Sequence, residues 1–374
     1  MMEGNDHMGL TAGIIGLPNV GKSTLFNAIT QSKVLSANYP FATIEPNVGV
    51  VAVKDERLDR IVEIVKPRNV VYTAFSFTDI AGLVKGASKG EGLGNQFLSH
   101  IREVDAICQV VRCFEDKNII HVYNKVDPLD DIETVNLELA LADLEIIEKR
   151  LPKIEKRALL KTDDDSTKEY NILLQIKETL ELGRGARDAN LTDEEALFIK
   201  NYNFLTMKPM IYVLNISESD LGHDNNHVLA VKALAKEHNI RTVTISAKIE
   251  EELSELSPED RTIFLNDLGI EESGLDLLIK EAYDLLGLQT FFTAGEKEAR
   301  AWTFRRGMKA PECAGVIHTD FEKGFIKAEV TSYQDFIKYG GLQKAKEAGK
   351  MRLEGKEYVF QDGDITVFRF GASS

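Results

Sequence analysis

The chain has only three cysteines and nine prolines among its 374 residues, and it contains no long apolar run. Three cysteines are too few for a disulfide framework, and they do not cluster as metal ligands do. We therefore interpret Cys108, Cys113 and Cys313 as reduced packing residues. No segment reaches the ~18 uninterrupted apolar residues of a membrane helix, and the polar start lacks a signal-peptide core. We expect a cytoplasmic protein without a membrane partner.

Positive charge is also scarce, because 45 Lys and Arg stand against 60 Asp and Glu and give a net charge of -15. A protein that coats nucleic acid by bulk electrostatics would carry the opposite sign. We expect no DNA binding, and any RNA contact must come from a local basic patch. The hydrophobic fraction of 43% is that of a globular protein, and the length exceeds two domains of ~150 residues.

Apolar strands alternate with helical patterns over much of the chain. Residues 1–8 are interpreted as an added or alternative leader, because a strand begins soon after them. A helix is expected from near Gly21. The expected strands are 12–15, 49–53, 73–78, 106–114, 209–214 and 241–245. This order predicts a parallel α/β domain over 9–130 and 205–287.

Two further segments have a different character. Residues 131–204 form a long, charged helical pattern whose apolar residues step by three or four, which predicts an inserted helical hairpin. Pro152 lies inside its first arm and should kink or break that helix. From 288 to 374, short strands separated by glycine turns predict a small α+β module.

A phosphate-binding motif, G-x-x-x-x-G-K-S, runs from Gly16 to Ser23 between the first strand and the first helix. Its backbone N–H groups can turn onto phosphate oxygens, assisted by the helix N-terminus. Lys22 should reach the β- and γ-phosphates, and Ser23 should bind Mg2+. The expected nucleotide contacts in this loop are Asn19, Val20, Gly21, Lys22, Ser23 and Thr24.

The remaining parts of a nucleotide switch follow in order. Asp79 ends a strand and opens a D-x-x-G motif, so it should hold Mg2+, and Gly82 should present its N–H to the γ-phosphate. Thr43 stands where a switch threonine would cap Mg2+ and the γ-phosphate, although an ordinary loop threonine is the alternative. The metal set is therefore Ser23, Thr43 and Asp79.

Four blocks of the sequence together resemble the YchF (Obg-like ATPase) family of P-loop NTPases. These blocks are Leu17–Ala28, Asn38–Asn47, Asp79–Ala87 and His318–Ile326. The resemblance implies an α/β fold: a P-loop NTPase G domain, an inserted helical coiled-coil hairpin over 131–204 and a C-terminal β-grasp (TGS) domain over 288–374. It also implies binding to the ribosome or its large subunit, through rRNA or a ribosomal protein.

Guanine recognition normally uses N-K-x-D, and a literal match spans Asn124–Asp127. Asn124 lies only ten residues after Phe114, which leaves no room for the helix and strand that should intervene. YchF-like proteins commonly have glycine at the position of Asn124. We interpret this match as coincidental.

A better base-binding candidate is Asn215–Glu218, which follows a predicted strand. Ile216 replaces the lysine and Glu218 the aspartate of N-K-x-D, so guanine recognition should be weakened. In YchF-like proteins this variant accompanies a preference for ATP, and Asn215 beside an apolar residue resembles an adenine-binding arrangement. The expected base contacts are Asn215, Ile216, Glu218, Ser246 and Ala247.

Leu83 stands where switch GTPases have the glutamine that orients the attacking water. Hydrolysis is then slow, or another polar group or a monovalent cation takes over. Asn19 matches the asparagine that binds K+ in related NTPases, although a loop-stabilising Asx turn is equally compatible. Gln109 occupies a place where many family members have histidine, and its amide could orient water. The catalytic candidates are Lys22, Thr43, Gly82 and Gln109, with Mg2+ as cofactor and K+ as a further candidate.

Two basic groups are candidate RNA contacts, and solvent-exposed charge is the alternative for both. One lies in the hairpin between Lys149 and Lys161, and the other joins Trp302 to Arg305, Arg306 and Lys309. Three functions remain open: an ATPase switch that binds ribosomes in translation or stress regulation, an Obg-type GTPase in ribosome assembly, and a nucleotide-gated adaptor with negligible turnover. We expect a monomer.

Overall fold

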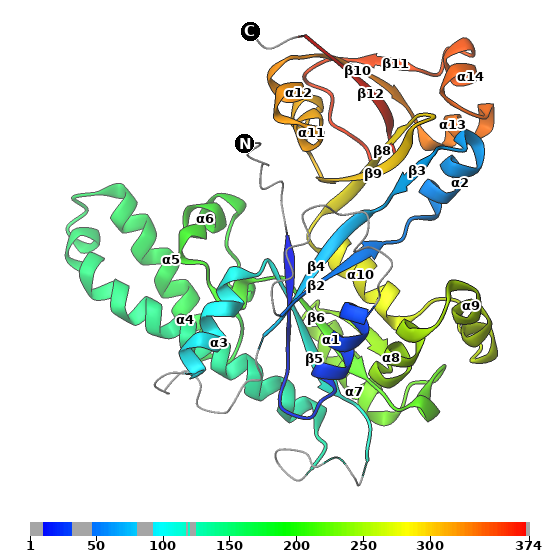
Figure 1. Cartoon of the computed structure of the whole chain (residues 1–374). Coiled ribbons are helices and arrows are strands. Elements are labelled where there is room, and N and C mark those ends of the chain that lie inside the picture. Colours follow the sequence, from blue (N-terminus) through cyan, green and yellow to red (C-terminus); the bar gives the residue numbers. More distant parts are fainter. Residues whose placement is uncertain (1–9, 32–46, 81–92, 117–118, 120–124, 372–374) are drawn as a thin grey trace.

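The computed structural model describes residues 10–31, 47–80, 93–116, 119 and 125–371. Two β-sheets lie one above the other, and a pair of long helices projects sideways from the lower sheet (Figure 1). Among the described residues, no helix is both long enough and apolar enough to cross a membrane.

The first sheet follows the strand order β2-β4-β1-β5-β6-β7. Its strands are β1 (Thr11–Ile15), β2 (Val48–Val53), β4 (Thr73–Asp79), β5 (Ala106–Arg112), β6 (Met210–Asn215) and β7 (Arg241–Ile245). Neighbours from β4 to β7 pair in parallel as predicted, but the edge strand β2 runs antiparallel to β4. Every residue of β5 is buried, as expected for a central strand covered on both faces.

Helices cover both faces of this sheet. They are α1 (Lys22–Gln31), α3 (Leu93–Glu103), α7 (Asn226–Glu237), α8 (Ala247–Glu255) and α10 (Gly274–Leu285), whereas α9 (Pro258–Asp267), between α8 and α10, buries none of its residues. Cys108 and Cys113 are buried in the core beneath them, and Cys313 is buried elsewhere; all three are free thiols. Burial raises the pKa of Cys108 and of Cys113 to about 12, so both remain neutral packing residues, as predicted.

The projecting arm consists of α4 (Pro128–Leu159) and α5 (Asp164–Glu181), followed by the short helix α6 (Asp193–Phe198). Ile147 and Ile154 of α4 pack in one apolar cluster with Ile176 of α5. Of the kink or break expected at Pro152, the break does not occur, because α4 continues through that residue, and the kink stays a prediction. A proline in a helix interior costs about 3 kcal/mol, and packing along α5 outweighs that cost.

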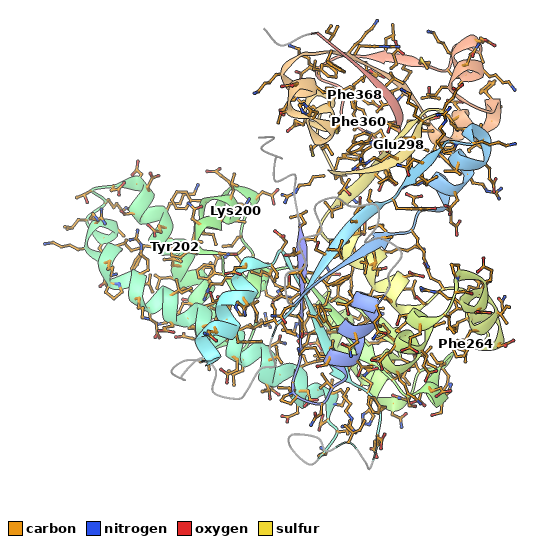
Figure 2. All side chains as sticks on the ribbon, viewed as in Figure 1. Lys200, Tyr202, Phe264, Glu298, Phe360 and Phe368 are labelled. Atoms are coloured by element: carbon orange, nitrogen blue, oxygen red, sulfur yellow. The ribbon has the colours of Figure 1, made fainter. Side chains whose placement is uncertain are left out.

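The second sheet has the order β11-β10-β12-β8-β9-β3. Its strands are β3 (Asn69–Val71), β8 (Leu288–Ala294), β9 (Glu298–Arg305), β10 (Phe325–Thr331), β11 (Arg352–Glu354) and β12 (Ile365–Phe370). The helices near it are α2 (Glu56–Val65), α11 (Ala310–Ile317), α12 (Thr319–Lys323), α13 (Tyr333–Tyr339) and α14 (Leu342–Glu347). Phe360 and Phe368, labelled in Figure 2, belong to its aromatic core with Phe291 and Phe304.

Helix α2 and strand β3 connect the two sheets, although they precede most of the first sheet in the sequence. Strand β3 pairs in parallel with β9, with Asn69 opposite Glu298. Leu58 and Ile61 of α2 are buried in one cluster with Phe292 of the second sheet. Residues 48–79 therefore leave the first sheet at β2, pass through the second sheet, and return at β4. The domain boundaries inferred from the sequence stay a prediction.

Candidate functional site

The phosphate-loop motif lies between β1 and α1, where its sequence places it. Gly21 has φ +96°, a conformation that side chains rarely adopt, and a Cβ there would lie 2.1 Å from the Nδ2 atom of Asn215. A Cβ at Gly16 would lie 3.0 Å from the carbonyl oxygen of Val110. Asn19 has φ 64°, which asparagine tolerates better than most residues. Both motif glycines are thus required by close approach of neighbouring strands or loops.

Lys22 and Asp79 meet beside this loop. Register pairing sets Asp79 opposite Ile14, one residue before the end of β1, and the Lys22 ammonium forms an ion pair with the Asp79 carboxylate. Ser23, next to Lys22 at the start of α1, is exposed. A hydroxyl and a carboxylate are hard oxygen donors of the kind that Mg2+ prefers. These residues fit a Mg2+-bound triphosphate held over the α1 N-terminus.

Asn215 ends β6 and links the phosphate loop to the loop after β7. Its Nδ2 donates to the carbonyl oxygen of Val20 at 2.8 Å, and its Oδ1 accepts from the N–H of Ala247 at 3.0 Å. The side chain is buried, and both ends of its amide are bonded to the backbone. In this structure Asn215 positions two loops, and the direct base contact expected from the sequence stays a prediction.

The other predicted base contacts surround Asn215. Ile216 is buried, and its N–H donates to the carbonyl oxygen of Ile245 at 2.9 Å. Glu218 is exposed, and its Oε2 lies 3.5 Å from the Nζ atom of Lys248. Ser246 is buried directly before α8, and Ala247 begins that helix. The structure therefore brings Val20, Asn215 and the β7–α8 loop together, while Glu218 lies at the solvent edge.

The last residue of the literal N-K-x-D match, Asp127, has a structural role at the start of α4. Asp127 is the N-cap of α4, and its side chain accepts a hydrogen bond from the N–H of Asp130. Lys125 forms an ion pair with Asp127 at 2.7 Å, and Asn124 lies outside the described residues. Asp127 begins a helix, as its position before Pro128 indicates.

Gln109 lies in β5 opposite Ile15 of β1 and Tyr212 of β6. Its side chain is 1% exposed, and its Oε1 has no hydrogen-bond partner among the described residues. A buried amide oxygen without a partner carries a desolvation cost of about 1–3 kcal/mol and calls for an explanation. Thr43 and Gly82, the other switch candidates, lie outside the described residues.

Two basic residues at this end of the sheet were not among the site residues predicted from the sequence. Arg112 is buried, and its guanidinium donates to the carbonyl oxygens of Phe114, Asp116 and Ile119 at 3.1–3.2 Å. Lys248 faces Glu218. Arg112 is a charged residue at the end of a fully buried strand. In the sequence, this position is the one signal that its guanidinium must bond to nearby carbonyl groups.

Family models match two parts of the chain. Residues 11–150 match the model described as "50S ribosome-binding GTPase", and residues 288–371 match the YchF-GTPase_C model, described as a protein of unknown function. A curated relative from Bacillus subtilis, named "Ribosome-binding ATPase YchF", is 59% identical over 97% of this chain and 100% of its own length. The chain belongs to the YchF family.

Other YchF proteins agree with this assignment. A relative of the same name from Escherichia coli O157:H7 is 52% identical over 97% of this chain and 99% of its own length. A solved structure described as the Schizosaccharomyces pombe YchF GTPase superposes with a TM-score of 0.88 at 41% identity, covering 98% of this chain and 99% of that one. The predicted family and fold class are confirmed, and the P-loop identifies a nucleotide hydrolase.

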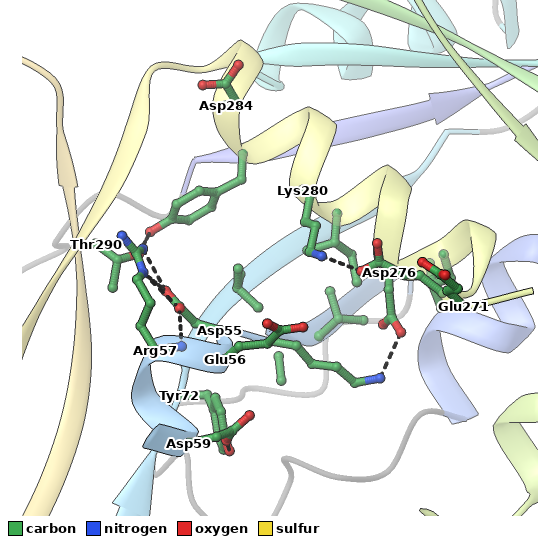
Figure 3. Close-up of a pocket in the computed structure, with 18 of the residues that line it drawn as sticks. Asp55, Glu56, Arg57, Asp59, Tyr72, Glu271, Asp276, Lys280, Asp284 and Thr290 are labelled. Atoms are coloured by element: carbon green, nitrogen blue, oxygen red, sulfur yellow. Dashed lines mark hydrogen bonds and ion pairs between the residues drawn. The ribbon is translucent and has the colours of Figure 1, made fainter. Parts of the chain in front are cut away.

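A separate cavity of about 1120 Å3 lies at the junction of the two sheets (Figure 3). Its walls come from β2, α2, α9, α10 and β8, and none of the phosphate-loop residues lines it. Ion pairs cross it: Arg57 binds Asp55 and Asp362 at 2.8 Å each, and Lys54 binds Asp276 at 2.7 Å. The cavity is therefore a charged junction between the sheets, distinct from the nucleotide site.

Proposed function

We propose that this YchF-family protein is a Mg2+-dependent ATPase that hydrolyses ATP, acts weakly on GTP, and binds ribosomes or the large ribosomal subunit according to its nucleotide state. The link that Asn215 makes between the phosphate loop and the β7–α8 loop supports the nucleotide site. The names of the bacterial relatives support ATP and the ribosome as ligands. The expected role is in translation or stress regulation.

The preference for ATP rests on the surroundings of Glu218. A guanine-reading carboxylate must stay available for the base, whereas Glu218 is exposed and lies within ion-pair reach of Lys248. Ile216 is buried in the protein core, so it leaves no lysine stem over the base plane. A site built around hydrogen bonds discriminates strongly when its partners are displaced. The affinity for GTP should therefore lose much of the advantage over ATP that an N-K-x-D site gives it.

Hydrolysis is proposed to use positioning and charge. Lys22 would bind the β- and γ-phosphates, while Ser23, Thr43 and Asp79 would hold Mg2+, which neutralises developing charge. Gly82 would bind a γ-phosphate oxygen. Gln109 is proposed to orient the attacking water, and its Oε1, which has no hydrogen-bond partner among the described residues, supports this role. Asn19 would hold K+ near the phosphates.

Titration with ATP and with GTP at fixed Mg2+ tests the base preference. We expect ATP to bind at least about tenfold more tightly, and Glu218→Asp to narrow that ratio because it shortens the carboxylate toward the guanine-reading length. Equal or tighter GTP binding would favour the Obg-type GTPase. The same preparations show by size-exclusion chromatography whether the protein is a monomer.

Turnover with and without large ribosomal subunits tests the rest of the proposal. We expect slow ATP hydrolysis alone and a changed rate with subunits. Absence of hydrolysis under both conditions, with nucleotide-dependent subunit binding retained, would favour the adaptor.

A further inference from the structure

Charge is distributed unevenly over this acidic protein, and two short stretches reverse the sign: 149–161 in the hairpin and 338–356 beside the second sheet. Between Lys338 and Lys356 there are six basic residues against two acidic ones, whereas the whole chain carries -15. This stretch includes the end of α13, all of α14 and strand β11. Four of its lysines, Lys338, Lys344, Lys346 and Lys350, are exposed and are called the α14 lysine surface below.

The α14 lysines lack acidic partners. Within the described part of the chain, none of the four makes an ion pair at 4.0 Å or less. Glu347 lies among them, but its carboxylate accepts a hydrogen bond from the Gln343 amide at 3.2 Å. Arg352, next to them, is paired with Glu354 at 2.9 Å. The four ammonium groups therefore face solvent outside any ion pair of the described residues, and the carboxylates of Glu347 and Glu329 offset only part of their charge.

Unlike the α14 lysines, several basic residues of the two groups noticed in the sequence form ion pairs. In the hairpin, Lys149 is paired with Glu145, and Arg150 binds Glu169 at 2.7 and 2.9 Å. Residues 149–161 hold six basic residues and one acidic residue, but three aspartates, Asp163 to Asp165, follow directly and reduce the positive charge at that end of the arm, so the hairpin variant below serves as the competing surface.

The group around Trp302 is also engaged within the protein. Arg300 stacks on the Trp302 ring at 3.9 Å, and the indole N–H donates to Thr293. Arg306 is paired with Asp284 at 3.3 Å, and Lys309 with Glu357 at 2.5 Å. Its basic side chains are mostly neutralised by carboxylates.

The α14 lysine surface rests on a rigid base. Lys344 and Lys346 flank Ala345, which is fully buried, and the N–H of Lys350 donates to the carbonyl oxygen of Ala345 at 2.8 Å. Phe336 of α13 is buried in the cluster that contains Leu58 of α2. The lysine stems therefore project from a backbone whose position is set by packing, which reduces the entropy lost on binding an extended polyanion.

We propose that the α14 lysine surface binds the phosphate backbone of ribosomal RNA. This inference rests on the proposed ribosome-binding function and names the surface and the chemical partner. Lysine ammonium groups bind phosphates as point charges without reading base sequence, so structured rRNA is recognised through its backbone. Locally concentrated positive charge is what an otherwise acidic protein needs to bind a polyanion.

The test compares three triple variants that remove equal charge. The first, Lys344→Gln with Lys346→Gln and Lys350→Gln, removes most of the α14 lysine surface. The second, Lys200→Gln with Lys236→Gln and Lys297→Gln, changes exposed lysines elsewhere. The third, Lys153→Gln with Lys156→Gln and Lys161→Gln, changes the hairpin. Each is titrated against isolated large ribosomal subunits and against naked rRNA at several salt concentrations, and ribosome-free ATP turnover checks folding.

We expect the first variant to lose about 10- to 100-fold in affinity at moderate salt, with a slope of log K against log salt that is about 2 smaller in magnitude. The second variant should bind as the wild type does, and all three should keep wild-type turnover. Wild-type affinity and slope in the first variant, or a loss confined to the hairpin variant, would overturn the proposal. If the wild type binds no subunits in any nucleotide state, the proposed ribosome binding fails. The titration with naked rRNA alone then decides whether the α14 lysine surface binds RNA.

Discussion

The amide of Asn215 donates a hydrogen bond to the carbonyl oxygen of Val20 at 2.8 Å, so the end of β6 holds the phosphate loop from behind. The same side chain accepts from Ala247 at the start of α8. A single buried side chain therefore joins the phosphate loop to the loop between β7 and α8.

The substitution Asn215→Ala should weaken ATP binding and also destabilise the fold. The buried carbonyl of Val20 and N–H of Ala247 would lose their partner, at a cost of about 2 kcal/mol or more. Nucleotide titration and urea unfolding measure the two effects. Asn27→Ala, which removes an exposed amide bonded to Glu251 at 3.3 Å, is the control and should change neither strongly. Unchanged ATP affinity in Asn215→Ala would show that the two loops are positioned by other contacts.

Lys22→Ala should abolish productive nucleotide binding. Lys22 is the basic residue of the motif and lies in contact with Asp79, so no other motif side chain can replace its charge at the phosphates. We expect a loss of affinity for the triphosphate of about hundredfold. Titration with ATP measures it, and Lys236→Ala on the exposed surface of α7 is the control. Undiminished ATPase activity would mean that the wrong loop has been identified.

Replacing Na+ by K+ should raise ATP turnover if Asn19 helps hold a cation near the phosphates. Positive charge near the developing negative oxygen lowers the barrier, and about 1.4 kcal/mol corresponds to a tenfold rate. Asn19→Gly should remove most of the response while preserving Mg-ATP affinity, because glycine tolerates the φ of 64° found there. Equal rates in the two salts would eliminate the cation hypothesis.

Gln109→Ala should lower ATP turnover with little change in ATP affinity. The side chain is buried, and its Oε1 has no hydrogen-bond partner among the described residues. A rate loss of about 10- to 100-fold is expected for a water-positioning group. Single-turnover hydrolysis measures it, and Gln109→Glu shows whether a carboxylate can substitute. An unchanged rate constant would assign the water to a group supplied by a partner.

Glu250 should make stability depend on pH. Its carboxylate is buried on α8, accepts from the N–H of Gly274 at 2.8 Å, and burial raises its pKa to about 7. Because the folded pKa lies above the unfolded one of 4.5, the folded state gains protons as pH falls. The wild type is therefore stabilised most below pH 4.5, and this contribution is lost as pH rises to about 7.

Glu250→Gln should remove this pH dependence. Relative to the wild type, the variant should gain about 2–3 kcal/mol of unfolding free energy between about pH 5 and pH 8. Urea unfolding at both pH values measures it, with Glu255→Gln, an exposed change on the same helix, as control. A constant difference between Glu250→Gln and wild type would show that Glu250 is ionised in the folded protein across this range.

Features with a local signature were predictable from the sequence. The strand 241–245 matches β7, and the motif glycines occupy the phosphate loop. The expectation that Pro152 could break the helix was wrong, because intrinsic propensity omits the packing of α4 on α5. The base contact expected of Asn215 stays a prediction, and its two backbone partners come from distant parts of the chain that no local pattern identifies.

The position of β3 illustrates the same limit. It has only three residues, too few for a periodic signal, and it pairs with β9 more than 200 residues later in the sequence. The spacing of Leu58 and Ile61 indicates a helix with one apolar face, but it does not say which sheet that face covers. Long-range pairing of this kind requires the folded structure.

The path of residues 48–79 makes the two sheets inseparable. Both ends of this segment lie in the first sheet, where the N–H of Asp79 donates to the carbonyl oxygen of Asn47 at 2.8 Å. A chain terminated before Leu288 would leave Leu58 and Ile61 facing water, at a cost of about 1.5–3 kcal/mol each. Gene fusion or truncation before Leu288 therefore cannot exchange the part of the chain on one side without unfolding part of the other. The two parts must be inherited together.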